Sequence, residues 1–323
     1  MTAKAGQSPP MTPISKEEKQ RIRSKNLRRD KYLILMMIPV VAYFLIFCYL
    51  PMTGLWISFT SFKPGQGLAG LFTGDFVGLK WFQQFFTSPY AWRLLRNTFL
   101  LSFYSLIFGF PIPILFAVCL TQIKSKFAQR GAQMVTFLPY FISTVVIVGM
   151  ITNFLSPSSG IINRFIEALG GEAQNFLGLP EYFRRIYVIS GSWQTFGFNS
   201  IIFVAAIMSI APELYEAMRV DGANKRQIIW HLVLPSIKPT IILLLIMSLG
   251  NILNVGFEKV YLMYTPGVYE TADVIQTYVY RQGIENHNYS YATAVGLFNS
   301  VVTFVIVSMA NKLSRKLTDT SIW

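Results

Sequence analysis

Between two long apolar segments, the chain reads Pro212-Glu-Leu-Tyr-Glu-Ala-Met-Arg-Val-Asp-Gly-Ala-Asn-Lys-Arg-Gln-Ile-Ile-Trp-His-Leu-Val-Leu-Pro-Ser-Ile-Lys-Pro239. Pro212 suits the first turn of a helix, where no backbone donor is needed. Asp221-Gly222 interrupts this helix, because glycine adopts a left-handed backbone at low cost. A second helix is expected from about Ala223 to near Leu234-Pro235, since proline disfavours a helical residue before it. The stretch therefore predicts two short helices joined by a tight turn.

Six segments of the chain are long and apolar enough to cross a lipid bilayer, which takes about 20 residues in a helix. They are Tyr32–Ile57, Asn97–Leu120, Ala132–Phe154, Ile186–Ile210, Thr240–Met263 and Ala292–Ala310. Composition agrees, because only 13% of the 323 residues are charged whereas soluble domains carry about 25%. The sequence predicts an all-α integral membrane protein with six transmembrane helices. Buried helices of a soluble protein are the alternative, which six such lengths disfavour.

Lysine and arginine are distributed unevenly among the segments that connect these spans. Residues 1–31, 121–131, 211–239 and 311–323 contain 19 of the 28, the other connecting segments contain eight, and Lys259 lies within the fifth span. Cytoplasmic loops carry the excess of lysine and arginine, so we expect both termini in the cytoplasm. The net charge of +13 is therefore a topology signal, and no nucleic-acid partner is predicted.

The predicted organisation has three parts. Residues 1–31 form a cytoplasmic tail without the apolar core of a signal peptide. Residues 32–310 form the membrane domain, with a cytoplasmic loop at 211–239, and residues 311–323 form a second cytoplasmic tail.

The 212–239 stretch resembles the EAA loop of permease subunits in binding-protein-dependent ABC importers. That pattern reads Glu-Ala-Ala, two variable residues, Asp-Gly-Ala and a distal apolar-Leu-Pro. Its counterparts here are Glu216, Ala217, Asp221, Gly222, Ala223, Leu234 and Pro235, and Met218 stands where the family usually has alanine. The resemblance implies that these residues couple the spans to the closing of a cytoplasmic ATPase.

Further stretches resemble carbohydrate-uptake permeases of the maltose type over the whole chain. They include Phe76-Val-Gly-Leu-Lys-Trp-Phe82, the Asn254–Tyr264 segment and the terminal Ser321-Ile-Trp323. The resemblance implies a type I ABC importer permease fold and a branch that handles oligosaccharides, often fragments of plant polysaccharide. It also implies a second permease subunit, mostly a different chain in such systems, two ATPase subunits that bind ATP and Mg, and an extracellular solute-binding protein.

Polar residues recur along two predicted spans at steps of three or four, which places them on one helical face. Ser248, Asn251, Asn254 and Glu258 lie in the fifth span, and Thr195 and Asn199 lie in the fourth, beside Trp193. Amides, hydroxyls and carboxylates suit sugar hydroxyls, and an aromatic ring suits the apolar face of a pyranose. These residues are candidates for the substrate path, with helix–helix packing as the alternative.

Rival functions have weaker support in the sequence. There is no Gly-x-x-x-x-Gly-Lys-[Ser/Thr] motif, so no P-loop nucleotide site is expected in this chain. His231 and His287 lack metal-ligand spacing, and no catalytic residue, cofactor or metal is predicted. A secondary transporter working without an ATPase and an ABC permease for a non-sugar solute remain the alternatives. The former would need buried carboxylates in several spans, whereas Glu258 is the one acidic residue in them.

Overall fold

The computed structural model describes residues 30–318, apart from positions 64, 66, 68, 69, 251 and 254. The chain separates into two units, a smaller one that ends at Trp56 and a larger one that begins at Ile57. Each is described by itself.

The described part of the smaller unit is one apolar helix. α2 (Lys31–Phe44) continues through the π-helical η1 (Leu45–Tyr49) and α3 (Leu50–Met52) into the 3₁₀ helix η2 (Thr53–Phe59). None of the described side chains of α2, η1 or α3 is buried. A helix that is apolar all round suits a lipid environment, so this element corresponds to the first predicted span.

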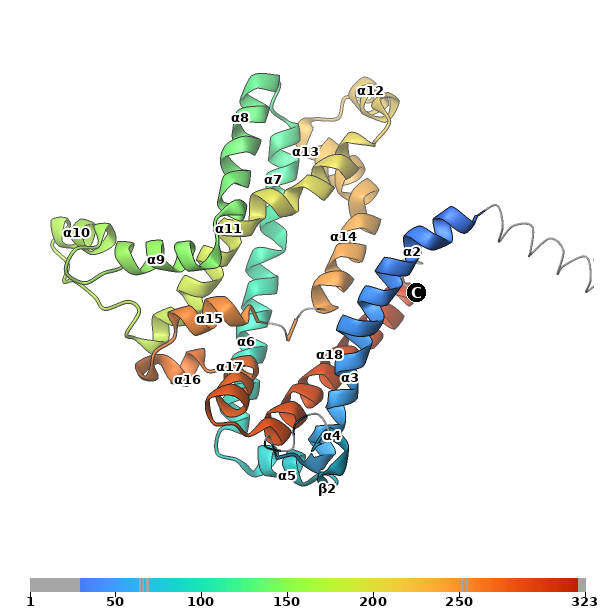
Figure 1. Ribbon diagram of the computed structural model, residues 1–323. Coiled ribbons are helices and arrows are strands. Elements are labelled where there is room, and N and C mark those ends of the chain that lie inside the picture. The colour runs from blue at the N-terminus through green and yellow to red at the C-terminus, as the bar shows by residue number, and fades with distance from the viewer. Residues whose placement is uncertain are drawn as a thin grey trace, which may run out of the picture. The chain divides into compact units, whose positions relative to one another are not determined.

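The secondary structure of the described residues of the larger unit is helical apart from one short two-stranded sheet (Figure 1). Its first elements are β1 (Thr60–Ser61), α4 (Gly70–Thr73), β2 (Asp75–Phe76), α5 (Lys80–Thr87), α6 (Ala91–Gly109), α7 (Pro111–Thr121), α8 (Lys126–Phe137), η4 (Leu138–Phe141), α9 (Thr144–Phe154) and α10 (Ile161–Ala168). β1 and β2 are antiparallel, with Thr60 opposite Phe76.

The second half of the larger unit begins with a long helix. The elements are α11 (Pro180–Met208), α12 (Pro212–Val220), α13 (Lys225–Ile228), the π-helical η5 (Ile229–Val233), α14 (Leu234–Gly250), α15 (Phe257–Met263), η6 (Pro266–Val268), α16 (Tyr269–Ala272), α17 (Ile275–Tyr280), the π-helical η7 (Arg281–Glu285) and α18 (Tyr289–Thr318). α11 packs along α6 and α7, and α14 packs against α18.

Four helices are each long and apolar enough to cross a membrane: Lys31–Phe59, Ala91–Thr121, Lys225–Gly250 and Tyr289–Lys312. Two bent pairs also qualify, Lys126–Phe141 with Thr144–Phe154 and Pro180–Met208 with Pro212–Val220. The described residues therefore hold four to six candidate spans, which agrees with the predicted helical membrane fold.

The third predicted span, Ala132–Phe154, is a bent pair of helices and not one continuous helix. The chain bends by 98° between the α8–η4 segment and α9. Pro139 lies in the 3₁₀ turn, and the Ser143 hydroxyl caps α9 by accepting from the backbone amide of Val146. The Gln194 side chain of α11 donates to the carbonyl of Ile142 at 3.1 Å, so a neighbouring helix satisfies a carbonyl that the break exposes.

The boundaries predicted around the fifth span are also wrong. The helix that follows the turn does not end near Leu234-Pro235, because η5 widens its last turn before the proline and α14 continues to Gly250. A π-turn of this kind accommodates proline's missing donor. The predicted end at Met263 fails as well, since α15 is a separate short helix. Glu258 therefore does not share one helical face with Ser248.

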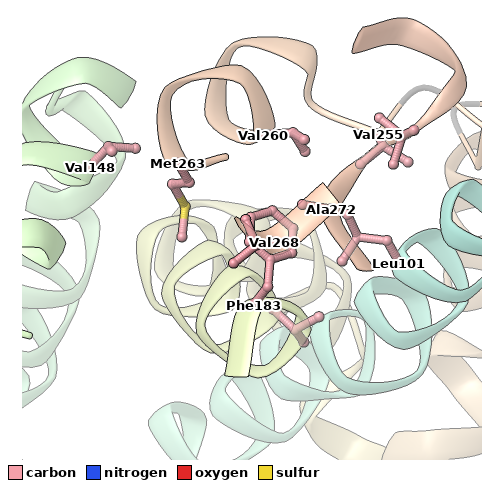
Figure 2. Close-up of a cluster of buried hydrophobic side chains, with 10 residues drawn as sticks. Leu101, Val148, Phe183, Val255, Val260, Met263, Val268 and Ala272 are labelled. Atoms are coloured by element: carbon pink, nitrogen blue, oxygen red, sulfur yellow. The ribbon is translucent and has the colours of Figure 1, made fainter. Parts of the chain in front are cut away.

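Buried apolar side chains from distant parts of the sequence form the core beside this break. Figure 2 shows Leu101 of α6, Val148 of α9 and Phe183 of α11 around residues of the 255–272 segment. Among these, Val260, Val268 and Ala272 are fully buried. The cluster attaches the segment between α14 and α17 to three other helices, which positions α15 for the site described below.

A polar network holds the next part of the chain. The fully buried carboxylate of Asp273 accepts from Arg93 of α6 at 3.1 Å and from Arg281 of η7 at 2.8 Å. The Asn97 amide donates to the Asp273 carbonyl at 3.0 Å, and Arg184 of α11 donates to the Asn97 Oδ1 at 2.7 Å. Burial alone would lower the pKa of Arg281, but the hydrogen bond and charge of Asp273 raise it.

Candidate functional site

A cavity of about 850 Å³ lies among α6, α7, α11, α14 and the 252–259 segment. Its polar lining comprises Ser102, Ser105, Thr144, Tyr187, Ser192, Gln194, Thr195, Asn199, Ser248, Glu258 and Lys259. Aromatic and aliphatic side chains such as Phe110, Phe198 and Phe257 complete the wall. A cavity of this size with both kinds of surface suits a small or medium organic solute.

Four of the seven predicted path residues line this cavity: Thr195, Asn199, Ser248 and Glu258. The Thr195 hydroxyl donates to the carbonyl of Gly191 at 3.0 Å, and the Ser248 hydroxyl donates to the carbonyl of Leu244 at 2.8 Å. Their oxygens keep acceptor capacity on the cavity side. Asn199 is exposed, and its amide has no hydrogen-bond partner among the described residues.

One of the other three predicted path residues does not line the cavity. Trp193 is 44% exposed and does not line the cavity, because it lies on a different face of α11 from Thr195 and Asn199. Asn251 and Asn254 lie outside the described residues.

Several lining residues were not among the predicted path residues. Ser102 and Ser105 lie three residues apart in α6, a spacing that the sequence does contain. Tyr187 and Lys259 meet across the fold: the Lys259 Nζ donates to the Tyr187 carbonyl at 3.3 Å. The backbone amide of Gly256 donates to the Tyr187 hydroxyl at 3.1 Å. No sequence pattern indicates these two contacts, because they join residues about 70 positions apart.

The two helices of the 212–239 stretch form a second candidate site, at one end of α11 and α14. Gly222 has a φ of +78°, so the predicted left-handed turn is present. Asn224 begins α13 with a capping box, in which its side chain accepts from Gln227 and the Gln227 side chain accepts from Asn224. The turn is therefore formed by local interactions: the left-handed Gly222 ends α12, and the Asn224–Gln227 capping box begins α13.

One face of this helix pair is attached to the protein and the other is free. Tyr215, Met218 and Ala223 pack against a core that contains the fully buried Val233 and Ile237. Met218, where the EAA pattern has alanine, thus fills space against the core. Glu216, Ala217, Asp221, Gly222 and Pro235 are exposed, whereas Leu234 is half-buried and belongs to the packed face. The predicted coupling residues divide into an exposed group and two anchors, Ala223 and Leu234.

The exposed group offers a compact surface. Val220 is 87% exposed and Leu214 is 49% exposed, beside the carboxylates of Glu216 and Asp221. Across the described residues, no three His, Cys, Asp or Glu side chains are close enough together to hold a metal ion.

Known proteins resemble this chain over most of its length. The polygalacturonan/rhamnogalacturonan transport system permease protein YteP of Bacillus subtilis (strain 168) is 39% identical over 96% of both chains. Protein LplB of the same organism is 41% identical over 90% of both chains. A chain in the crystal structure of a bacterial ABC transporter involved in the import of the acidic polysaccharide alginate superposes with a TM-score of 0.84 at 45% identity. That match covers 91% of this chain and 98% of the other.

The structural match confirms the predicted importer-permease fold. Residues 96–319 match the model of a family described as binding-protein-dependent transport system inner membrane component. This matched range contains the cavity-lining residues, Asp273 and the helix pair around Gly222. The chain is therefore a member of the family of inner membrane components of binding-protein-dependent transport systems.

Proposed function

We propose that the chain is the permease subunit of an ATP-driven importer in the cytoplasmic membrane and forms half of the path for an oligosaccharide. The observation that carries this proposal is the cavity among α6, α7, α11 and α14, in which hydroxyls, an amide and a carboxylate share the wall with aromatic rings. Hydroxyl-rich solutes need such polar groups, and pyranose faces need apolar surface. YteP, which is similar over 96% of its length, is named as a permease protein of a polygalacturonan/rhamnogalacturonan transport system.

The exposed face of the α12–α13 pair supports a separate ATPase. Glu216 and the Gly222 turn come directly before α13. From Lys225, the helix continues through α13, η5 and α14 past the cavity-lining Ser248 to Gly250. A continuous helix transmits a displacement at one end to the other, so closing of an ATPase on this face would move the cavity wall. Two ATPase subunits would bind ATP and Mg, and a second permease that is a related but different chain would complete the path.

The external partner is an extracellular solute-binding protein. A second crystal structure shows the bacterial alginate ABC transporter in complex with an alginate pentasaccharide-bound periplasmic protein. The matching chain of that structure is 45% identical to this one. We place the α12–α13 pair and both termini in the cytoplasm, which puts the opposite end of the spans towards the binding protein. This orientation follows the lysine and arginine distribution.

Uptake into reconstituted vesicles tests the proposal. The permease pair with its ATPase and a sugar-loaded binding protein is expected to accumulate a labelled oligosaccharide only when ATP is supplied on the ATPase side. Uptake driven by an ion gradient without the ATPase would contradict the importer, and transport of peptides or metal ions in place of sugars would contradict the substrate class.

A cavity variant links the uptake to this chain. Asn199→Leu removes the exposed amide from the wall and is expected to reduce uptake severalfold, because sugar hydroxyls lose a donor and an acceptor. Asn153→Leu is the matched control, since Asn153 is an exposed asparagine of α9 that does not line the cavity. Equal uptake by the two variants would show that the cavity is not part of the substrate path.

A further inference from the structure

The ammonium group of Lys259 lies at the wall of the cavity and is almost enclosed by protein. The residue is only 7% exposed. Its Nζ lies 5.1 Å from the centre of the Tyr187 ring and 3.3 Å from the Tyr187 carbonyl oxygen. A Cβ added to Gly191 would lie 3.4 Å from the same nitrogen. Tyr187, Gly191 and Lys259 all line the cavity, so a solute in the cavity would lie next to this amine.

This cation has no anionic partner among the described residues. The ion pairs that the structure records within these residues all use Asp273. Glu258 precedes Lys259 and also lines the cavity, yet the two side chains form no ion pair, because successive residues of α15 point in different directions. A carbonyl dipole and a ring face offset only part of the cost of burying a charge.

Contacts between α15 and α11 fix the position of the amine. The Gly256 amide, which donates to the Tyr187 hydroxyl, fixes the start of α15 against α11. The protein therefore holds a charged donor in place at the cavity without neutralising it.

We propose that Lys259 binds a carboxylate of the transported solute, so that the cargo is an oligosaccharide containing acidic sugars such as uronates. This inference rests on the proposed function and narrows its substrate class. A carboxylate completes the unfilled hydrogen-bonding capacity of the ammonium and supplies its counter-ion in a site with little water. The hydroxyls of Thr195 and Ser248, the Asn199 amide and the ring of Phe257 remain available for the neutral parts of the sugar.

The experiment compares an acidic oligosaccharide with its own neutral derivative. Uptake of a galacturonate oligomer and of its fully methyl-esterified form is measured in vesicles containing the complete importer, at saturating concentration of loaded binding protein. The importer with native Lys259 is expected to transport the acid at least tenfold faster. Lys259→Met is expected to bring the acid-to-ester ratio close to one, whereas Lys259→Arg, which keeps the charge, is expected to retain most of the preference.

Lys80→Met is the matched control, because Lys80 is an exposed lysine over the Trp81 ring that does not line the cavity. Its acid-to-ester ratio is expected to stay at the native value. An unchanged ratio in Lys259→Met, or transport of neutral oligosaccharides alone, would overturn the role of Lys259 and leave the oligosaccharide importer standing. Absence of any ATP-dependent oligosaccharide uptake by the native assembly would overturn both. Co-purification of the ATPase with each variant shows that the assembly is intact, and the ratio is read only within intact assemblies.

Discussion

At the scale of a single residue, Gly222 is the position of the α12–α13 turn that the backbone restricts most. Its φ of +78° is strained for any residue with a Cβ, although nothing lies within 4 Å of the place a Cβ would occupy. Gly222→Val is therefore expected to distort the turn by backbone strain, at about 1–3 kcal/mol, and to weaken ATPase association. Gly222→Asn is expected to retain coupling, because asparagine tolerates this conformation. Binding-protein-stimulated ATP hydrolysis in vesicles is measured for both variants. Activity of Gly222→Val equal to that of the native protein would show that the turn geometry is not needed.

Glu216 tests the exposed face without changing the backbone. Its side chain points away from the core that Tyr215 and Met218 contact, so Glu216→Lys should leave insertion and folding intact. If an ATPase cleft binds this carboxylate, reversal of its charge is expected to reduce co-purification of the ATPase and transport severalfold. Glu167→Lys, on the exposed surface of α10, is the control. Normal transport by Glu216→Lys at normal protein level would contradict the coupling role.

At the scale of the elements, the Asp273 carboxylate connects α6 with η7. Asp273→Asn keeps the shape but leaves Arg93 and Arg281 facing each other without their counter-ion. Removing one partner of a buried ion pair costs about 3–5 kcal/mol. The arginine side chains are 33% and 20% exposed, so solvent screens their repulsion. We therefore expect the free energy of unfolding to fall by about 2 kcal/mol.

The midpoint of thermal inactivation of the purified protein in detergent measures this loss of stability. Asp75→Asn is the control, because Asp75 is an exposed carboxylate of β2 and its neutralisation should leave the midpoint unchanged. A midpoint for Asp273→Asn equal to that of the native protein would mean that the network does not stabilise the contact between α6 and the 265–285 segment.

At the scale of the whole molecule, the orientation across the membrane can be measured directly. Cysteine at the exposed position Glu172, between α10 and α11, is expected to react with an impermeant thiol reagent added outside intact cells. Cysteine at the exposed position Lys124, between α7 and α8, is expected to be protected until the cells are opened. The native Cys48 and Cys119 are both exposed in the structure and are replaced by serine first. Labelling of position 124 from outside would reverse the proposed topology and remove the α12–α13 pair from the cytoplasm.

The sequence by itself determined the helical membrane fold, the family and the Gly222 turn. Apolar length and lysine and arginine distribution are local properties, and a glycine between two helical patterns requires no tertiary information. The resemblance at Glu216 to Pro235 likewise depends on residue order alone. The sequence also predicts Thr195, Asn199 and Ser248 as path residues. Each lies on a regular helix, where spacing in the sequence determines which residues lie on the same helical face.

Only the tertiary structure decided where the spans break and which residues meet in the cavity. The bend after Phe141 depends on α11, where Gly197 lets the Thr136 carbonyl approach and Gln194 bonds the Ile142 carbonyl. The helix through Pro235 depends on a π-turn that propensity does not indicate. Lys259 reads in the sequence as the neighbour of Glu258, yet it faces Tyr187 of α11 because packing around Val260 and Phe183 sets the rotation of α15. Contacts between residues about 70 positions apart arise from packing, and no local pattern encodes them.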